Sequence, residues 1–273
     1  MLKTIEETVI KDKTKNSPGW KNIALFLIGW IGLQIVATII QTIILFSSNI
    51  PTGEIANFVF GDTVTKAIYD VLSKSWVDIT VNSIAYLIIA VAMSLILNKD
   101  WKTLLESFKK GSPFVAGIIG YFLIIVFNNV YNNLIGPFYQ ISDNINEETL
   151  DSIIVIYPVI SLIVFGLIGP LCEELTYRVG LYGLIKRKNK VLGYILTIII
   201  FGFIHFSFQT ILVFMNTGNS SLLINELLNM PTYMFAAAVF IYLYDNYGLA
   251  GSLSAHVINN LISIVTQIIL SRL

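Results

Sequence analysis

The chain has 273 residues, of which 55% are hydrophobic and only 12% are charged, and its net charge is zero. A soluble domain carries about 25% charged residues, so this composition excludes an ordinary soluble protein and predicts an integral membrane protein. The long apolar runs lack the alternation of membrane β-strands, which favours helices over a barrel. Zero net charge provides no field that would attract nucleic acid, and a single cysteine excludes an intrachain disulfide.

The first 21 residues are polar and contain five lysines. No short apolar segment with a small-residue cleavage site follows them, which predicts a cytoplasmic N-terminal tail over residues 1–21 without a cleavable signal peptide. Residues 22–270 then form a single predicted transmembrane domain. We expect an all-α, polytopic membrane protein with about 7–8 transmembrane helices, since each span needs about 20 apolar residues. The predicted spans are 22–46, 77–97, 113–135, 153–184, 191–208, 232–244 and 249–270.

Two stretches between the predicted spans are less regular. Residues 50–76 are expected to form an external loop with an amphipathic portion. Residues 210–230 contain a short apolar run followed by the loop-like segment 216–221. They therefore form either a re-entrant piece or a short eighth helix, and the side of the membrane on which the C-terminus lies depends on that choice.

Charged residues in the predicted loops set the orientation of the chain. The N-terminal tail and two further loops carry clusters of lysine and arginine, whereas the loop 136–151 carries four acids and no basic residue. Because basic loops face the cytoplasm, we expect a multi-pass protein of the plasma membrane with a cytoplasmic N-terminus. The frequent isoleucine, lysine and asparagine indicate an AT-rich, bacterial genome.

Two adjacent acids, Glu173 and Glu174, end a long apolar run inside the fourth predicted span. One charged residue near the centre of a bilayer costs about 2.5–3.5 kcal/mol on insertion scales, so a pair of acids there needs a partner or a function. Arg178 follows Glu174 at i,i+4 and can form a local ion pair with it. That ion pair would leave Glu173 available for a functional role.

The only two histidines, His205 and His256, lie in later predicted spans. Positions 173 and 205 are equidistant from the basic turn between the fourth and fifth spans, so in an antiparallel hairpin Glu173 and His205 face each other. At 1.5 Å per residue they would lie roughly 15–20 Å below the cytoplasmic surface. Phe201 and His205 are four residues apart, as are His256 and Asn260, which places each pair on one helical face. Acids, imidazoles and an amide are the residue types that a hydrolytic site uses, so together these side chains are candidates for one.

These residues resemble the three motifs of the CAAX-protease and bacteriocin-processing family of intramembrane proteases, also called the CPBP or Abi family. The match covers about residues 153–260. It implies hydrolysis of a peptide bond near the end of a prenylated protein or in a bacteriocin- or pheromone-type peptide, so the partners are a peptide or lipidated protein and membrane lipid, with no nucleic acid. The three motifs are Glu173-Glu174-x-x-x-Arg178, Phe201-x-x-x-His205 and His256-x-x-x-Asn260.

The resemblance also implies a role for each motif residue. Glu173 would be the general base that activates a water molecule, with His205 holding that water or moving its proton. His256 and Asn260 would donate hydrogen bonds to the developing oxyanion, an interaction often worth about 3–4 kcal/mol per donor. Three further residues would support the catalytic ones: Glu174, Arg178 and Phe201.

The sequence leaves two mechanisms open with respect to a metal cofactor. Zinc is the candidate, since two histidines, a glutamate and an asparagine could ligate it with an open position. However, the chain has no His-Glu-x-x-His motif, and a metal-free glutamate mechanism uses the same residues. The ligand set, if a metal is bound, is Glu173, His205, His256 and Asn260.

Two functions outside proteolysis are also compatible with the pattern. The first is a non-catalytic membrane protein of the same fold that binds a peptide or confers bacteriocin immunity. The second is a transporter in which the acids form a proton relay, although the absence of an internal repeat argues against it. A Glu173→Gln substitution separates the first from a protease, because a binder would largely keep its function.

Overall fold

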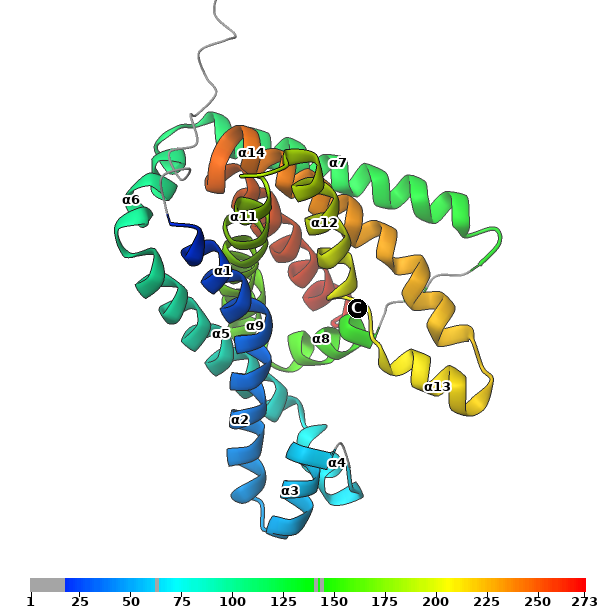
Figure 1. The fold of residues 1–273 in the computed structure, drawn as a ribbon. Helices are drawn as coiled ribbons and strands as arrows, with labels where there is room; N and C mark the ends of the chain where they lie inside the picture. The colour runs from blue at the N-terminus through cyan, green and yellow to red at the C-terminus, as the bar shows by residue number, and fades with distance from the viewer. Residues whose placement is uncertain (1–17, 62–63, 140–141, 143–144) are drawn as a thin grey trace, which may run out of the picture.

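Every regular element in the described part of the chain is a helix, as the composition predicted (Figure 1). The computed structural model describes residues 18–61, 64–139, 142 and 145–273. Most of the predicted tail 1–21 lies outside these residues, and the first helix begins at Gly19, three residues before the predicted span.

The helices follow one another through short connections. The first half of the chain contains α1 (Gly19–Leu27), α2 (Leu33–Phe46), α3 (Thr52–Gly61), α4 (Lys66–Leu72), α5 (Ser75–Leu97), α6 (Trp101–Leu104) and α7 (Ser112–Ile135). The second half contains α8 (Ile145–Ile156), α9 (Pro158–Ile163), α10 (Gly169–Glu173), α11 (Gly183–Ile185), α12 (Lys190–Phe203), α13 (Gln209–Thr217) and α14 (Ser221–Leu270).

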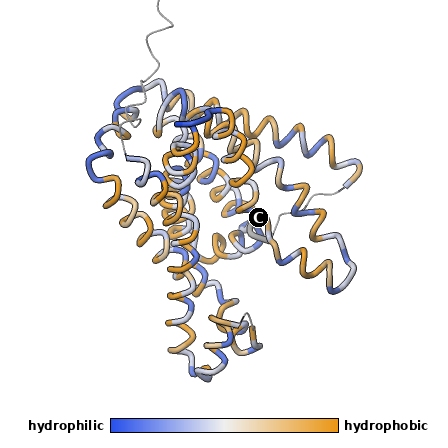
Figure 2. The backbone as a smooth tube through the Cα atoms, in the orientation of Figure 1, coloured by the Kyte–Doolittle hydropathy of each residue, from blue (hydrophilic) through white to orange (hydrophobic). Residues whose placement is uncertain are grey.

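Five helices in the described residues are long and apolar enough to cross a membrane. The longest, α14, is divided at Gly248, whose φ of +73° is readily adopted only by glycine. A sixth apolar helix, α12, has 14 residues. The division of α14 into two limbs raises the number of separate segments to seven, and the expected number of 7–8 transmembrane helices stays a prediction. Figure 2 shows hydrophobic residues along most of the length of these helices.

Some boundaries that we predicted from the sequence are wrong. Residues 210–230, which the sequence left open as a re-entrant piece or a short eighth helix, contain the short helix α13 and the start of α14, so the span predicted from residue 232 begins at Ser221. Residues 50–76 are not simply a loop, since α3 and α4 occupy most of them. The fourth span begins at Pro158 instead of 153, because the backbone leaves the helical region at Tyr157 (φ −125°, ψ 57°). Proline suits the first turn of the next helix, where its missing N–H costs nothing.

The helix that carries both predicted acids runs from Pro158 to Ile185 and combines α9, α10 and α11. We call it the glutamate helix. It is the most buried of the candidate spans. Two parts of it, Val164–Ile168 and Glu174–Tyr182, are π-helical, and π-helical turns occur frequently at functional sites.

Helix α1 packs directly against the backbone of the glutamate helix. A Cβ atom at Gly180 would lie 2.9 Å from the backbone nitrogen of Phe26, so the two backbones approach as closely as only glycine permits. Asn22 fixes the contact, because its Nδ2 donates a 2.6 Å hydrogen bond to the carbonyl of Val179. Arg187 in turn donates to Oδ1 of Asn22 at 2.6 Å.

A second anchor joins the glutamate helix and α12 to the bend of α14. The hydroxyl of Tyr182 donates a 2.8 Å hydrogen bond to Asp245, three residues before the break at Gly248. Lys190, the first residue of α12, forms a 2.5 Å ion pair with the same carboxylate. These contacts hold one end of all three helices together, so the registers of their site residues are fixed relative to one another.

Candidate active site

A cavity of about 740 Å³ lies beside the middle of the glutamate helix. Its lining includes all four residues that we predicted to be catalytic: Glu173, His205, His256 and Asn260. Phe201 also lines this cavity, whereas Glu174 and Arg178 do not. The structure therefore brings the three motifs to one place and separates the predicted supporting pair from the cavity.

The two adjacent acids occupy different environments. The side chain of Glu173 is 21% exposed, whereas that of Glu174 is completely buried. Glu174 forms the predicted i,i+4 ion pair with Arg178, with 3.2 Å between Oε1 and Nη1, and Arg178 is also completely buried. A buried carboxylate is tolerated only with such a partner, so Glu174 is neutralised within the protein while Glu173 reaches the cavity.

Two aromatic rings enclose the guanidinium of Arg178. The centre of the Phe201 ring lies 4.4 Å from Cζ and that of Phe240 lies 5.1 Å from it. Both distances are within the range of cation–π interactions. Phe201 therefore packs against the ion pair of Glu174 and Arg178, and it also contacts the rings of both histidines.

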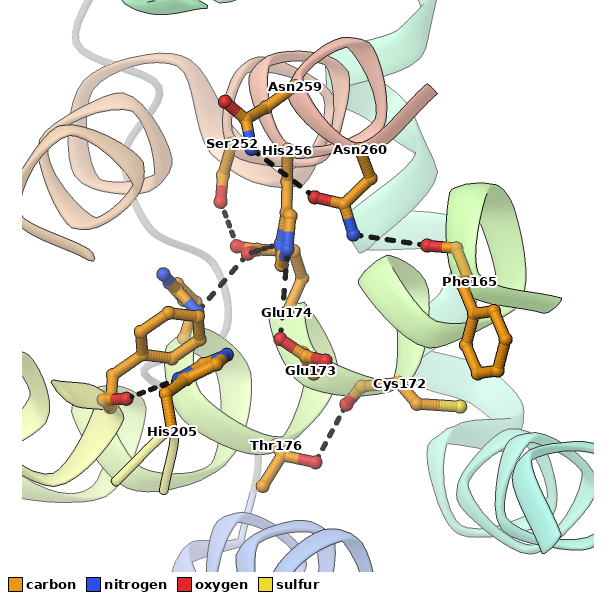
Figure 3. A network of polar contacts seen from close by, with 12 residues as sticks. Phe165, Cys172, Glu173, Glu174, Thr176, His205, Ser252, His256, Asn259 and Asn260 are labelled. Carbon is orange, nitrogen blue, oxygen red and sulfur yellow. Dashed lines mark hydrogen bonds and ion pairs between the residues drawn. The ribbon is translucent and has the colours of Figure 1, made fainter. Parts of the chain in front are cut away.

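His256 joins the two acids (Figure 3). Its Nδ1 lies 2.8 Å from Oε1 of Glu174, and its Nε2 lies 3.7 Å from Oε2 of Glu173. The hydroxyl of Ser252, one turn earlier on α14, donates to the other oxygen of Glu174. Phe240 stacks on the imidazole at 4.5 Å between ring centres. The position of the His256 ring is thus fixed at its edge and on its face, with Nε2 directed to the cavity acid.

Asn260 lies one turn after His256 on the second limb of α14. Its Nδ2 donates a 3.0 Å hydrogen bond to the carbonyl of Phe165 on the glutamate helix, and Nδ2 of Asn259 lies 3.4 Å from its Oδ1 (Figure 3). A primary amide carries two N–H donors. One is used by Phe165, and the other can serve a ligand in the cavity.

His205 is not on a helix, which corrects the predicted span 191–208. Helix α12 ends at Phe203, and the chain continues through turns with His205 N bonded three residues back to Gly202. The side chain still folds back over the helix, because its Nδ1 lies 2.8 Å from the carbonyl of Phe201. Tyr233 of α14 stacks on the imidazole with 4.2 Å between ring centres.

The sequence reasoning missed Glu226, which is buried as Glu174 is. It is 2% exposed, and its carboxylate accepts a 2.9 Å hydrogen bond from the backbone N–H of Ser207. Ser207 lies two residues after His205 in the break between α12 and α13, where the helical hydrogen-bond pattern has ended. An available signal was the spacing of Asn225, Glu226 and Asn229, which places polar residues on one face of a helix.

The predicted metal ligands, Glu173, His205, His256 and Asn260, all line the cavity. In the described part of the chain, no group of three or more His, Cys, Asp or Glu side chains is placed as metal ligands would be. The hydrogen bonds of Asn260 Nδ2 to Phe165 and of His256 Nδ1 to Glu174 do not involve Asn260 Oδ1 or His256 Nε2, the atoms that would bind a metal. The metal-ligand set therefore stays a prediction.

The fold and the site define a class of protein: an integral membrane protein with a glutamate–histidine site inside a helical bundle. Residues 155–262 match the model of the family described as type II CAAX prenyl endopeptidase Rce1-like. This match confirms the family resemblance predicted from the three motifs, and it covers the part of the chain that carries them. No curated protein and no solved structure matches the chain.

Proposed function

We propose that this chain hydrolyses a peptide bond at the membrane with a water molecule activated by Glu173. The observation that carries the proposal is the different environment of the two adjacent acids. Glu174 is sealed and paired with Arg178, whereas Glu173 reaches a cavity that His205 and His256 also line. A general base must be accessible to the water that it deprotonates, and of these two acids only Glu173 satisfies that condition.

In the proposed reaction, Glu173 takes a proton from water while the water oxygen bonds to the substrate's carbonyl carbon. The tetrahedral intermediate then expels the amine as the C–N bond breaks. The proton held by Glu173, or passed through His205, moves to the departing nitrogen. The products are a new carboxylate and a new amino terminus, and the carboxylate of Glu173 is restored for the next turnover.

The oxyanion of the intermediate is assigned to His256 and Asn260. Asn260 has one N–H beyond the bond to Phe165. An imidazole that donates from both nitrogens is an imidazolium, so this role requires His256 to be protonated when Nδ1 faces Glu174. Both donors are fixed in advance by protein contacts, which is what makes oxyanion stabilisation effective.

The substrates that we propose are the C-terminal part of a prenylated protein or a bacteriocin- or pheromone-type peptide. This choice is supported by the family match and by an intramembrane cavity with a largely apolar lining. The chain would act in the plasma membrane with its N-terminus in the cytoplasm. Basic residues in the tail and around residues 186–190 support this orientation.

Cleavage of prenylated and leader-type peptides by purified protein in detergent tests the proposal. We expect Glu173→Gln and His205→Ala to lose cleavage by at least about a hundredfold, as is typical when general acid–base catalysis is removed. Glu148→Gln is the matched control, because Glu148 is an exposed acid of α8 that does not line the cavity. Cleavage by Glu173→Gln at the wild-type rate would contradict the proposal. Peptide binding without cleavage by any form would instead favour the non-catalytic alternative.

A further inference from the structure

We infer that Pro170 is a positioning residue for Asn260. It has no backbone N–H, and this leaves the carbonyl of Phe165 available to hold the Asn260 amide. The catalytic consequence rests on the proposed function, in which Asn260 donates to the oxyanion. The structural part rests only on the backbone of the glutamate helix and on one side-chain hydrogen bond.

The hydrogen-bond register of the glutamate helix shifts just before Pro170. Val164–Ile168 is π-helical, and the N–H of Gly169 bonds to the carbonyl of Val164, five residues back. In the same register, the next donor would be the nitrogen of residue 170 and the next acceptor the carbonyl of Phe165. Because proline lacks an N–H, this bond cannot form.

A buried carbonyl that lacks a partner is costly, and such groups are nearly always paired elsewhere. Phe165 is 9% exposed, and its carbonyl accepts the 3.0 Å hydrogen bond from Nδ2 of Asn260, 95 positions away in the sequence. The missing bond in one helix thus becomes a contact between two helices. The side of the glutamate helix that offers the carbonyl is the side that faces the cavity, since Phe165 and Asn260 both line it.

The contact fixes which end of the Asn260 amide faces the glutamate helix. Nδ2 faces Phe165, and Nδ2 of the neighbouring Asn259 approaches Oδ1. An oxyanion donor must point to one position before the charge develops. A free amide would rotate, so the carbonyl released by Pro170 supplies the orientation that the proposed chemistry requires.

A purely structural role for Pro170 predicts a different outcome from substitution. If the proline only shaped the helix, Pro170→Ala would either damage the fold or change nothing in the reaction. On the positioning hypothesis, alanine provides an N–H and removes an unfavourable residue from the helix interior, so stability is kept. In a π-helical register the new N–H competes with Asn260 for Phe165. In an α-helical register the N–H of Gly169 competes for the same carbonyl.

The experiment compares four variants in detergent: Pro170→Ala, Pro158→Ala, Asn260→Ala and the double variant Pro170→Ala/Asn260→Ala. Pro158 is the matched control, because it opens α9 where a missing N–H has no consequence. We expect Pro170→Ala to keep or raise Tm while kcat falls about tenfold at unchanged KM, since small misplacements of catalytic groups have effects of this size or larger. The double variant should be no slower than Asn260→Ala alone.

A wild-type kcat in Pro170→Ala, a lowered Tm, or additive losses in the double variant would each overturn the inference. If Asn260→Ala and Glu173→Gln both cleave as the wild type does, the proposed function has failed instead. A readout independent of cleavage is the side-chain amide resonance of Asn260 in protein labelled with ¹⁵N-asparagine, assigned by its loss in Asn260→Asp. It should move in Pro170→Ala and stay in place in Pro158→Ala, and an unchanged resonance in Pro170→Ala contradicts the inference.

Discussion

The adjacent acids should respond in opposite ways to the same substitution, because one is structural and the other reaches the cavity. Replacing Glu174 with glutamine keeps the shape and removes the charge that faces Arg178. Within the described structure no guanidinium nitrogen of Arg178 has a hydrogen-bond acceptor. Its charge is therefore compensated by the 3.2 Å ion pair with Glu174 and by the rings of Phe201 and Phe240.

Both partners of this ion pair are completely buried. Removing one partner of a buried pair costs about 3–5 kcal/mol, because the other charge is left without compensation. For a chain of this size, 1 kcal/mol corresponds to about 2–4 °C in Tm. Glu174→Gln should then lower Tm by about 6–20 °C. Glu173 is 21% exposed and lies 3.7 Å from Nε2 of His256, an interaction worth at most about 1 kcal/mol.

Thermal unfolding in one detergent measures both effects, and peptide cleavage is followed in parallel. We expect Glu173→Gln to be inactive with a nearly wild-type Tm and Glu174→Gln to be strongly destabilised. Adding Arg178→Met to Glu174→Gln should recover much of the lost stability, since removing both charges of a buried pair is often close to neutral. Equal Tm values for the two glutamine variants would refute the assignment of separate roles.

Three further predictions concern the packing of α1 on the glutamate helix, the turn that carries His205, and the metal. Gly180→Ala should destabilise the protein by about 1–3 kcal/mol, measured by thermal unfolding, because its Cβ would lie 2.9 Å from the nitrogen of Phe26. Glu226→Ala should lower kcat by about tenfold or more, because it displaces the turn between α12 and α13 that carries His205. Glu226→Gln still offers an acceptor to Ser207, so its kcat should stay near the wild-type value. Equal losses of kcat in the two variants would show that the charge of Glu226 matters. Cleavage should persist in a zinc chelator, and loss that added zinc restores would show that the predicted ligands close around a metal.

The fold class and most spans were predictable because the bilayer imposes one simple rule on the sequence. A helix that crosses it must be apolar over about 20 residues, and the spans at residues 77–97 and 113–135 differ by two residues or fewer from α5 and α7. The errors fall where that rule gives no information. Residues 210–230 contain the short helix α13 and the start of α14, where Glu226 bonds to Ser207, a contact that no hydropathy pattern shows.

The motif residues of the site could be found from the sequence because each is unusual where it stands. An acid or a histidine in an apolar span needs an explanation, and Glu173, His205 and His256 needed one together. The contacts that hold Asn260 and the turn after His205 were not predictable, because they come from backbone positions. Two examples are the carbonyl of Phe165, which holds Asn260, and the N–H of Ser207, which Glu226 holds.

The pairing of two acids at one point in a membrane helix has a physical reason. A single carboxylate at Glu173 would need a histidine held beside it, and a histidine ring in an apolar bundle has no fixed orientation by itself. Glu174 supplies that orientation through Nδ1 of His256, and Arg178 balances the charge that this requires. In the proposed function, the second acid thus supports the first: the charge of Glu174 is balanced inside the protein by Arg178, and Glu174 orients His256 at the cavity.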